Sequence, residues 1–219
     1  MVYYFKSTAL PEYGENGVSL YMGKNKEENE DLIKHAYPVD IWFHVDNLSS
    51  AHVYLRLPSG LNWENIPEAL LEDIGQLTKA NSIEGNKKDN VTIIYTPASN
   101  LKKNKGMATG QVGFKKDGNK MVKKVFIAKK VNAIMNRLNK TKKEAFPDLR
   151  QERLDWEREE AAIQKKASLS LNATLEHQAR ETYNANYQKQ HAYDDLFTED
   201  NLRHTSNQFR DENWEDDFM

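Results

Sequence analysis

The sequence predicts an α+β fold, with a mostly antiparallel sheet and packed helices, followed by a long C-terminal helical extension and a disordered acidic tail. Short segments with alternating hydrophobic residues recur up to about residue 127, and capped amphipathic segments lie between them. Neither proline nor glycine occurs after Pro147, which permits a long helix. We therefore expect an α+β domain over residues 1–146, a charged helix over 147–190 and an acidic tail over 191–219.

The N-terminal elements are predicted from hydrophobic pattern and capping residues. Val2–Phe5 predicts a buried strand, and Val18–Met22 predicts its hairpin partner across a loop rich in proline, glycine and asparagine. Asn25 and Glu28 resemble a capping box that opens a helix to about His35.

The middle of the chain predicts a helix and a strand. The helix is expected to begin at Asn65, to hold Pro67 in its first turn and to end near Asn81. Val91–Tyr95 predicts a strand, which Thr96-Pro97 ends.

A hairpin and a helix are expected next. The turn dipeptide Asp117-Gly118 predicts a hairpin between Gln111–Phe114 and Met121–Ile127. From about Ala128 a helix is expected to carry an apolar face and to include Lys140, Lys142 and Lys143 before Pro147 interrupts it. The apolar face consists of Val131, Ile134, Met135 and Leu138.

The C-terminal extension leaves two structural alternatives. Leu149, Trp156 and Ile163 are seven residues apart, as in a coiled coil, but Ser170 breaks the series. A solvated single helix, or a segment that folds only on a partner, is therefore the alternative to a coiled coil. Residues 194–219 are rich in aspartate and glutamate and lack periodicity, which predicts disorder.

Residues 40–57 are the most informative segment for function. Both halves alternate, so we expect a hairpin through Asp46–Ser50. One register satisfies both patterns and pairs Val45 with Ala51, His44 with His52, Phe43 with Val53, Trp42 with Tyr54 and Asp40 with Arg56. In that register one face is aliphatic, and the other displays aromatic rings, two imidazoles and an Asp–Arg pair. The second face is therefore predicted to bind a ligand.

The same segment resembles a known family. The motif Trp42-Phe43-His44-Val45, followed by Ser49-Ser50-Ala51-His52-Val53, is similar to the core of the NFACT-R domain of ribosome quality-control proteins. Tyr95-Thr96, Asn100-Leu101-Lys102-Lys103 and Gly110 extend the resemblance. It is closest to the group of small stand-alone members named coiled-coil domain-containing protein 25. The resemblance implies an RNA- or ribosome-binding module and includes Thr96 and Asn100 in the site.

Composition and charge narrow the classes of function. The chain has no cysteine, which excludes disulfides, thiol catalysis and thiolate zinc sites and favours a cytoplasmic location. No segment is long and apolar enough for a membrane span, and Met1–Leu10 lacks the order of a signal peptide. Residues 79–143 hold 17 basic and 3 acidic side chains within a chain of net charge −2. This segregated basic block is suited to anionic partners.

Other chemistry at this face is less favoured. His44 and His52 could bind a metal with Asp46 or Asp40, but a third histidine is missing nearby. Ser49 or Ser50 with His52 could suggest a nucleophile, yet no strand-to-helix elbow is visible. Phosphate loops of the P-loop and GxGxxG types are also missing. We therefore expect no enzyme, no metal and no cofactor.

The function predicted from the sequence is a non-enzymatic module that binds structured RNA, on a ribosome or a tRNA, through phosphates. Lysines outnumber arginines in the basic block, which favours contact with the backbone over reading of bases. DNA binding by the same surface, and a protein-interaction adaptor acting through the C-terminal helix and tail, are the alternatives. The predicted nucleic-acid site comprises Trp42, His44, Ser49, Ser50, His52, Tyr54, Arg56, Thr96, Asn100, Lys102, Lys103, Lys105, Lys115, Lys116, Lys123 and Lys124.

Overall fold

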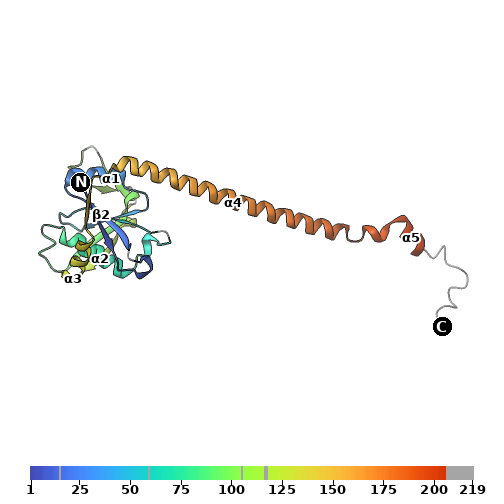
Figure 1. The fold of residues 1–219 in the computed structure, drawn as a ribbon, viewed down its shortest axis with the longest axis horizontal. Coiled ribbons are helices and arrows are strands. Elements are labelled where there is room, and N and C mark those ends of the chain that lie inside the picture. The colour runs from blue at the N-terminus through green and yellow to red at the C-terminus, as the bar shows by residue number, and fades with distance from the viewer. Residues whose placement is uncertain (15, 59, 105, 116–117, 206–219) are drawn as a thin grey trace, which may run out of the picture. The chain divides into compact units, whose positions relative to one another are not determined.

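The computed structural model describes residues 1–14, 16–58, 60–104, 106–115 and 118–205 (Figure 1). The chain divides into two compact units, Met1–Glu157 and Arg158–Met219. The first unit holds the sheet and extends beyond residue 146, where we expected the domain to end, because the first turns of the long helix pack on it.

The first unit is built on a seven-stranded sheet with the strand order β8-β5-β3-β4-β2-β1-β9. Every pair of neighbouring strands is antiparallel. In chain order the strands are β1 (Val2–Ser7), β2 (Val18–Gly23), β3 (Asp40–Val45), β4 (Val53–Arg56), β5 (Val91–Pro97), β8 (Lys123–Ile127) and β9 (Lys143–Ala145). A separate two-stranded ribbon pairs β6 (Leu101–Lys102) with β7 (Gly113–Phe114). The predicted α+β class with an antiparallel sheet is confirmed.

The described residues also form five α-helices and five short 3-10 turns. The helices are α1 (Lys26–His35), α2 (Glu68–Ala80), α3 (Asn132–Lys140), α4 (Leu149–His191) and α5 (Glu199–Thr205). The 3-10 turns span Pro11–Tyr13, Trp63–Asn65, Ala98–Asn100, Gly118–Met121 and Asp194–Phe197.

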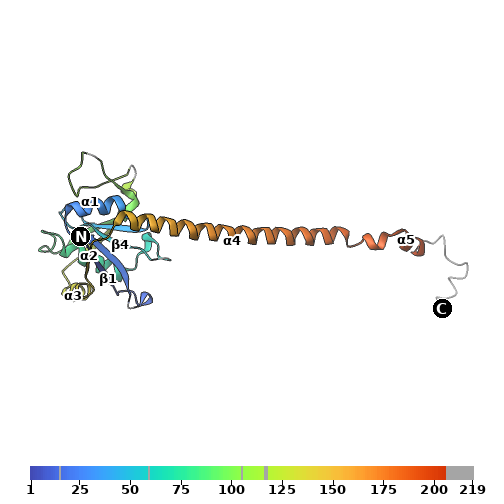
Figure 2. The ribbon, with the colours of Figure 1, turned by 45° about the horizontal axis from the view of Figure 1, so that its top comes forward.

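Both faces of the sheet are covered. One face packs on α2 and α3 in a large core that includes Phe43, Leu55, Leu70, Ile74 and Leu138. The opposite face packs on α1, the ribbon and the start of α4, through Leu32, Leu101 and Leu149. Figure 2 shows α1 and the beginning of α4 on one side of the strands and α3 toward the opposite side. Few sheet side chains are therefore left in contact with solvent.

The starts of the first two helices follow their capping residues. The side chain of Asn25 accepts a hydrogen bond from Glu28 N at 2.8 Å, which confirms the predicted cap of α1. The side chain of Asn62 instead caps the 3-10 turn before α2, and Pro67 occupies the N-cap position. Helix α2 therefore begins at Glu68, later than expected.

The predicted hairpin between 111–114 and 121–127 is wrong. Strand β7 pairs with β6, and β8 pairs with β5 in the main sheet. This register places Ile127 opposite Val91 and buries it in the core, a gain that a local hairpin would not provide. Of the expected turn, Asp117 lies outside the described residues.

The helix after Ala128 also ends earlier than expected. The hydroxyl of Thr141 donates to Leu138 O at 2.8 Å and accepts from Lys6 N at 2.9 Å. Helix α3 therefore ends here, and the residues that follow pair with β1. Lys143 therefore lies on the edge strand β9, and Lys142 lies between the two elements, rather than on the helix.

The second unit continues α4, which is 43 residues long and has no buried residue. The predicted long helix is confirmed, whereas its coiled-coil pairing stays a prediction. Within the expected tail, Asp194–Phe197 form a 3-10 turn and Glu199–Thr205 form α5. The rest of the expected tail lies outside the described residues. No helix among the described ranges has the length and apolar character needed to cross a membrane.

Candidate functional site

The central hairpin adopts most of the predicted register. Asp40 pairs with Arg56, Trp42 with Tyr54, and Phe43 with Val53, as expected. The two expected pairs nearest the turn do not form in the ladder. Instead, Val45 N donates to Ser50 Oγ at 3.0 Å, and Ala51 N donates to Asn81 O at 3.0 Å.

The predicted exposure of the aromatic face is wrong. Trp42 is 2% exposed, His52 is 3% exposed and Tyr54 is fully buried. The face is covered because α1 and the ribbon pack on this side of the sheet as a second layer. These side chains therefore form a second core, and in this conformation they cannot stack on a base.

The buried rings form one cluster with unusual polar atoms. The ring of Trp42 stacks on His44 with centroids 5.3 Å apart, and His52 meets both rings edge-on. Trp42 Nε1, His52 Nδ1 and Tyr54 OH are buried without a hydrogen-bond partner in the described part of the chain. Phe114 of the ribbon covers Trp42 edge-on at 6.1 Å.

Both imidazoles of this cluster are neutral at physiological pH. Burial lowers the pKa of His44, against a hydrogen bond with the Val45 backbone that raises it. Burial, together with repulsion from His44, lowers the pKa of His52 to about 4. Neither ring therefore supplies a positive charge to a phosphate.

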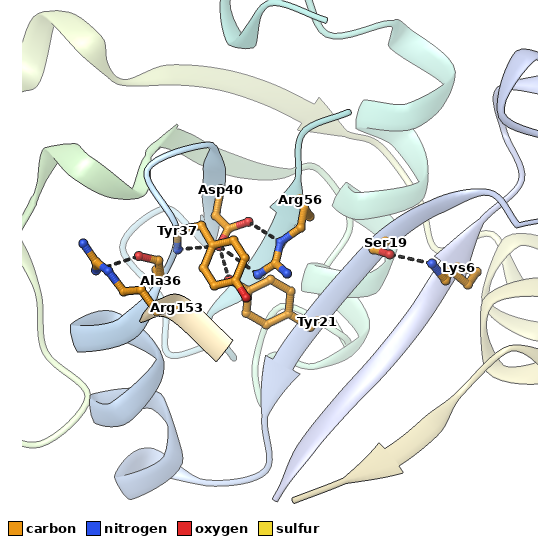
Figure 3. A network of polar contacts seen from close by, with 8 residues as sticks. All are labelled: Lys6, Ser19, Tyr21, Ala36, Tyr37, Asp40, Arg56 and Arg153. Atoms are coloured by element: carbon orange, nitrogen blue, oxygen red, sulfur yellow. Dashed lines mark hydrogen bonds and ion pairs between the residues drawn. The ribbon is translucent and has the colours of Figure 1, made fainter. Parts of the chain in front are cut away.

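Arg56 is already occupied by its neighbours (Figure 3). Its Nε donates to Asp40 Oδ1 at 3.1 Å, and its guanidinium lies 3.5 Å from the ring centre of Tyr37. Asp40 is fully buried and also accepts from Tyr21 OH at 2.5 Å and Tyr37 N at 2.7 Å. The predicted Asp–Arg pair is thus a structural centre rather than a free phosphate contact.

Thr96 and Asn100 are internal as well. Thr96 Oγ1 donates to Met121 O at 2.9 Å and accepts from Asn100 Nδ2 at 2.9 Å. Both residues are buried. They connect the end of β5 to the 3-10 turn that precedes β8 and do not face a ligand.

Ser49 and Ser50 lie at the edge of an open hollow. Ser50 Oγ accepts from Val45 N and donates to Ala51 O at 3.1 Å, while Ser49 O accepts from Ser82 Oγ at 2.6 Å. The hollow has a volume of about 230 Å³ and is also lined by Lys24, Lys26 and the start of α1. Helix N-termini and lysines both attract anions.

The predicted lysines differ in how far they are engaged. Lys124 pairs with Asp46 at 2.9 Å, and Lys123 donates to Glu64 O beside the ring of Trp63. Lys103 pairs with Glu30 at 2.6 Å. Lys102 and Lys115 are exposed, and their ammonium groups contact no acceptor within the described ranges. Lys105 and Lys116 lie outside those ranges.

Two cations at the start of α1 were missed by the sequence analysis. Lys24 and Lys26 are exposed and flank the N-cap Asn25. A Cβ placed on Gly110 would lie 3.5 Å from Lys26 Cγ, so the start of α1 is adjacent to the ribbon connection. The name α1–ribbon surface is used here for five lysines, of which all but the half-buried Lys103 are exposed: Lys24, Lys26, Lys102, Lys103 and Lys115. The signal available in the sequence was a lysine on each side of a helix cap.

Metal binding finds no support in the described side chains. No group of three histidine, aspartate or glutamate side chains converges there.

Comparison with known proteins identifies the family. The model of the NFACT protein RNA binding domain matches residues 1–116. The chain belongs to the NFACT-R family. Membership of this family supports a nucleic-acid-binding role for the domain.

Several relatives of this NFACT-R chain are similar over most of their length. Coiled-coil domain-containing protein 25 of Mus musculus is 55% identical over 73% of this chain and 74% of its own. The homolog of Dictyostelium discoideum is 50% identical over 70% of each chain. Protein JLP2 of Saccharomyces cerevisiae is 41% identical over 67% of this chain and 70% of its own. The predicted resemblance to this group is confirmed.

Proposed function

We propose that this chain is a non-enzymatic RNA-binding module that acts in the cytoplasm on the ribosome or a tRNA and holds RNA by its phosphates. The observation that carries the proposal is the α1–ribbon surface, where Lys26 of α1 and Lys103 after β6 both lie close to Gly110. The family description supports RNA as the nucleic acid. Because the α1–ribbon surface has lysines and no arginine, it should contact the phosphate backbone of a nucleic acid rather than its bases. DNA of similar charge should therefore compete with RNA for this surface.

Charge reversal of Lys102 and Lys115 tests this proposal. K102E/K115E should weaken binding of a structured RNA by about tenfold or more at low salt, because two phosphate contacts become repulsive. The matched control is K165E/K166E, which makes the same change of net charge on α4. Fluorescence anisotropy measures the affinity, and thermal unfolding should be nearly unchanged because exposed charges contribute little to folding. Equal loss of affinity in the two variants would remove the α1–ribbon surface from the proposal.

A protein-interaction role for α4 is the second candidate. Large apolar side chains on this helix are more than half exposed, including Ile163 at 61%, Leu169 at 60% and Leu171 at 59%. Such side chains are suited to a partner helix or a second copy. Removing residues 158–219 should abolish capture of a protein partner and preserve RNA binding, and loss of RNA binding instead would favour α4 as the nucleic-acid element.

A further inference from the structure

An anion site is built where α1 meets the ribbon connection. Glu30 Oε1 accepts from Lys103 Nζ at 2.6 Å and from Gly110 N at 2.5 Å. Both donors therefore converge on a single carboxylate oxygen. A carboxylate oxygen and a non-bridging phosphate oxygen accept hydrogen bonds of the same kind.

The position of the Lys103 ammonium does not depend on Glu30 alone. Nζ also donates to Ala108 O at 2.7 Å and to Gln111 O at 2.8 Å. An ammonium has three N–H donors, so two are held by carbonyls and the third points at the anion. The site is thus pre-organised by the backbone of its own loop.

Gly110 and the neighbouring hollow give an anion access. Gly110 has φ +81°, a conformation that favours glycine, and this turn directs its N–H toward Glu30. A hollow of about 430 Å³ opens beside the site and is lined by Glu30, Lys103, Asn104, Met107 and Thr109. The side chain of Glu30 is 30% exposed, so it can turn toward solvent without leaving a buried charge.

We propose that Lys103 and Gly110 bind one phosphate group of RNA, and that Glu30 occupies this site as an internal competitor in the free protein. The proposal rests on the RNA-binding function above and adds a defined phosphate position and its regulation. A phosphate oxygen takes over the two donors as Glu30 leaves. Lys24, Lys26 and Lys102 then surround the neighbouring phosphates.

Glu30 competes throughout the physiological pH range. Burial would raise the pKa of its carboxyl, but hydrogen bonds from Lys103 and Gly110 outweigh burial and lower the pKa below its ordinary value. The Glu30 carboxylate is therefore negatively charged at the pH at which the protein meets RNA. RNA affinity in the unmodified chain is reduced by the work of displacing it.

The variant E30Q tests the competition in the full chain. Glutamine keeps the length of the side chain but removes its charge, so a 12-nucleotide polyuridylate should bind about fivefold more tightly at low salt. The matched control is D31N, which removes one charge from the next residue of α1, where the side chain is exposed. D31N should give a clearly smaller gain, and E30Q/K103M should lose the gain entirely. Equal gains in E30Q and D31N, or a gain that persists in E30Q/K103M, would overturn the proposal.

The amide signal of Gly110 provides a second, direct measurement. In NMR titrations of the full chain with inorganic phosphate, this signal should shift at lower phosphate concentration in E30Q than in the parent. The parent should show the same shift at higher concentration, which tests the site without a substitution. A Gly110 signal that ignores phosphate in both proteins would refute the site. If the signal responds as expected and no variant binds RNA, the anion site stands and the RNA-binding function fails.

Discussion

At the scale of single residues, polar side chains predicted to meet a ligand instead organise a second core. His52 is almost completely buried with one unpaired nitrogen, and Asp40 is fully buried with three donors around it. When burial changes the pKa of such a group on folding, the free energy of unfolding depends on pH.

The stability of the first unit should depend on pH through His52. Its pKa falls from 6.5 in the unfolded chain to about 4 in the folded one. The neutral form is therefore favoured by folding: the contribution is complete above pH 6.5 and is lost as the pH falls toward 4. Urea unfolding should show about 1–2 kcal/mol less stability at pH 5 than at pH 7. H52Q should flatten this dependence, and a parallel pH profile for H52Q would show that other groups cause it.

Asp40 should contribute more to stability than Asp46, a half-buried carboxylate on the same hairpin. D40N leaves the Arg56 guanidinium without its buried counter-charge, so we expect a loss of about 3 kcal/mol in the free energy of unfolding. D46N removes an ion pair whose Lys124 partner is 63% exposed, and should cost less than about 1 kcal/mol. Urea denaturation of both variants measures the difference. Similar losses would mean that Asp40 is not the centre of the network.

At the scale of elements, the start of α4 belongs to the first unit. The ring of Trp156 stacks on Tyr37 at 5.1 Å. Arg153 Nη1 donates to Ala36 O at 2.9 Å, which satisfies a carbonyl at the end of α1 (Figure 3). The apolar contact of Leu149 with the second core adds to this attachment. A domain cut at residue 146 would remove these contacts.

Substitution of Trp156 tests this attachment. W156A should lower the stability of the first unit by about 1–3 kcal/mol and raise hydrogen exchange in residues 149–157, because stacking and burial are lost together. L169A on the same helix removes a side chain that is 60% exposed and should change neither quantity. Unchanged exchange in W156A would show that the helix start is held by other contacts.

At the scale of the whole molecule, charge is sorted between parts of the chain. Residues 158–219 carry 7 basic and 13 acidic side chains, a net of −6, so the other 157 residues carry +4 of the total of −2. Within the first unit, the ribbon and the start of α1 bring together lysines that are far apart in sequence. RNA binding should therefore depend on salt in proportion to the lysines that contact phosphate.

The salt dependence of RNA affinity measures the number of lysine–phosphate contacts. If Lys24, Lys26, Lys102, Lys103 and Lys115 each meet a phosphate of single-stranded RNA, the slope of log affinity against log salt should be about −3.5. K102Q/K115Q should reduce the slope to about −2, since each contact contributes about −0.7. A slope near zero in the parent chain would exclude phosphate contacts as the source of affinity.

The sequence by itself determined the local features. Alternation of hydrophobic residues predicted most strand positions, though not β6 or β9, and the pairing of Trp42 with Tyr54. Asn25 predicted the cap of α1. These features depend on neighbours in sequence, or on two strands joined by a short turn. The basic block and the family motif were visible for the same reason.

Only the tertiary structure decided which surfaces are free. Period-two alternation separates the faces of a strand but does not say whether a second layer covers either face. Here α1 and the ribbon bury Trp42 and His52, and β8 pairs with a distant strand rather than with β7. The approach of Lys26 to Gly110, and of Glu30 to Lys103, likewise joins residues more than seventy positions apart. Such contacts form when separate elements pack together, and the periodicity of hydrophobic residues along the sequence does not show which elements will do so.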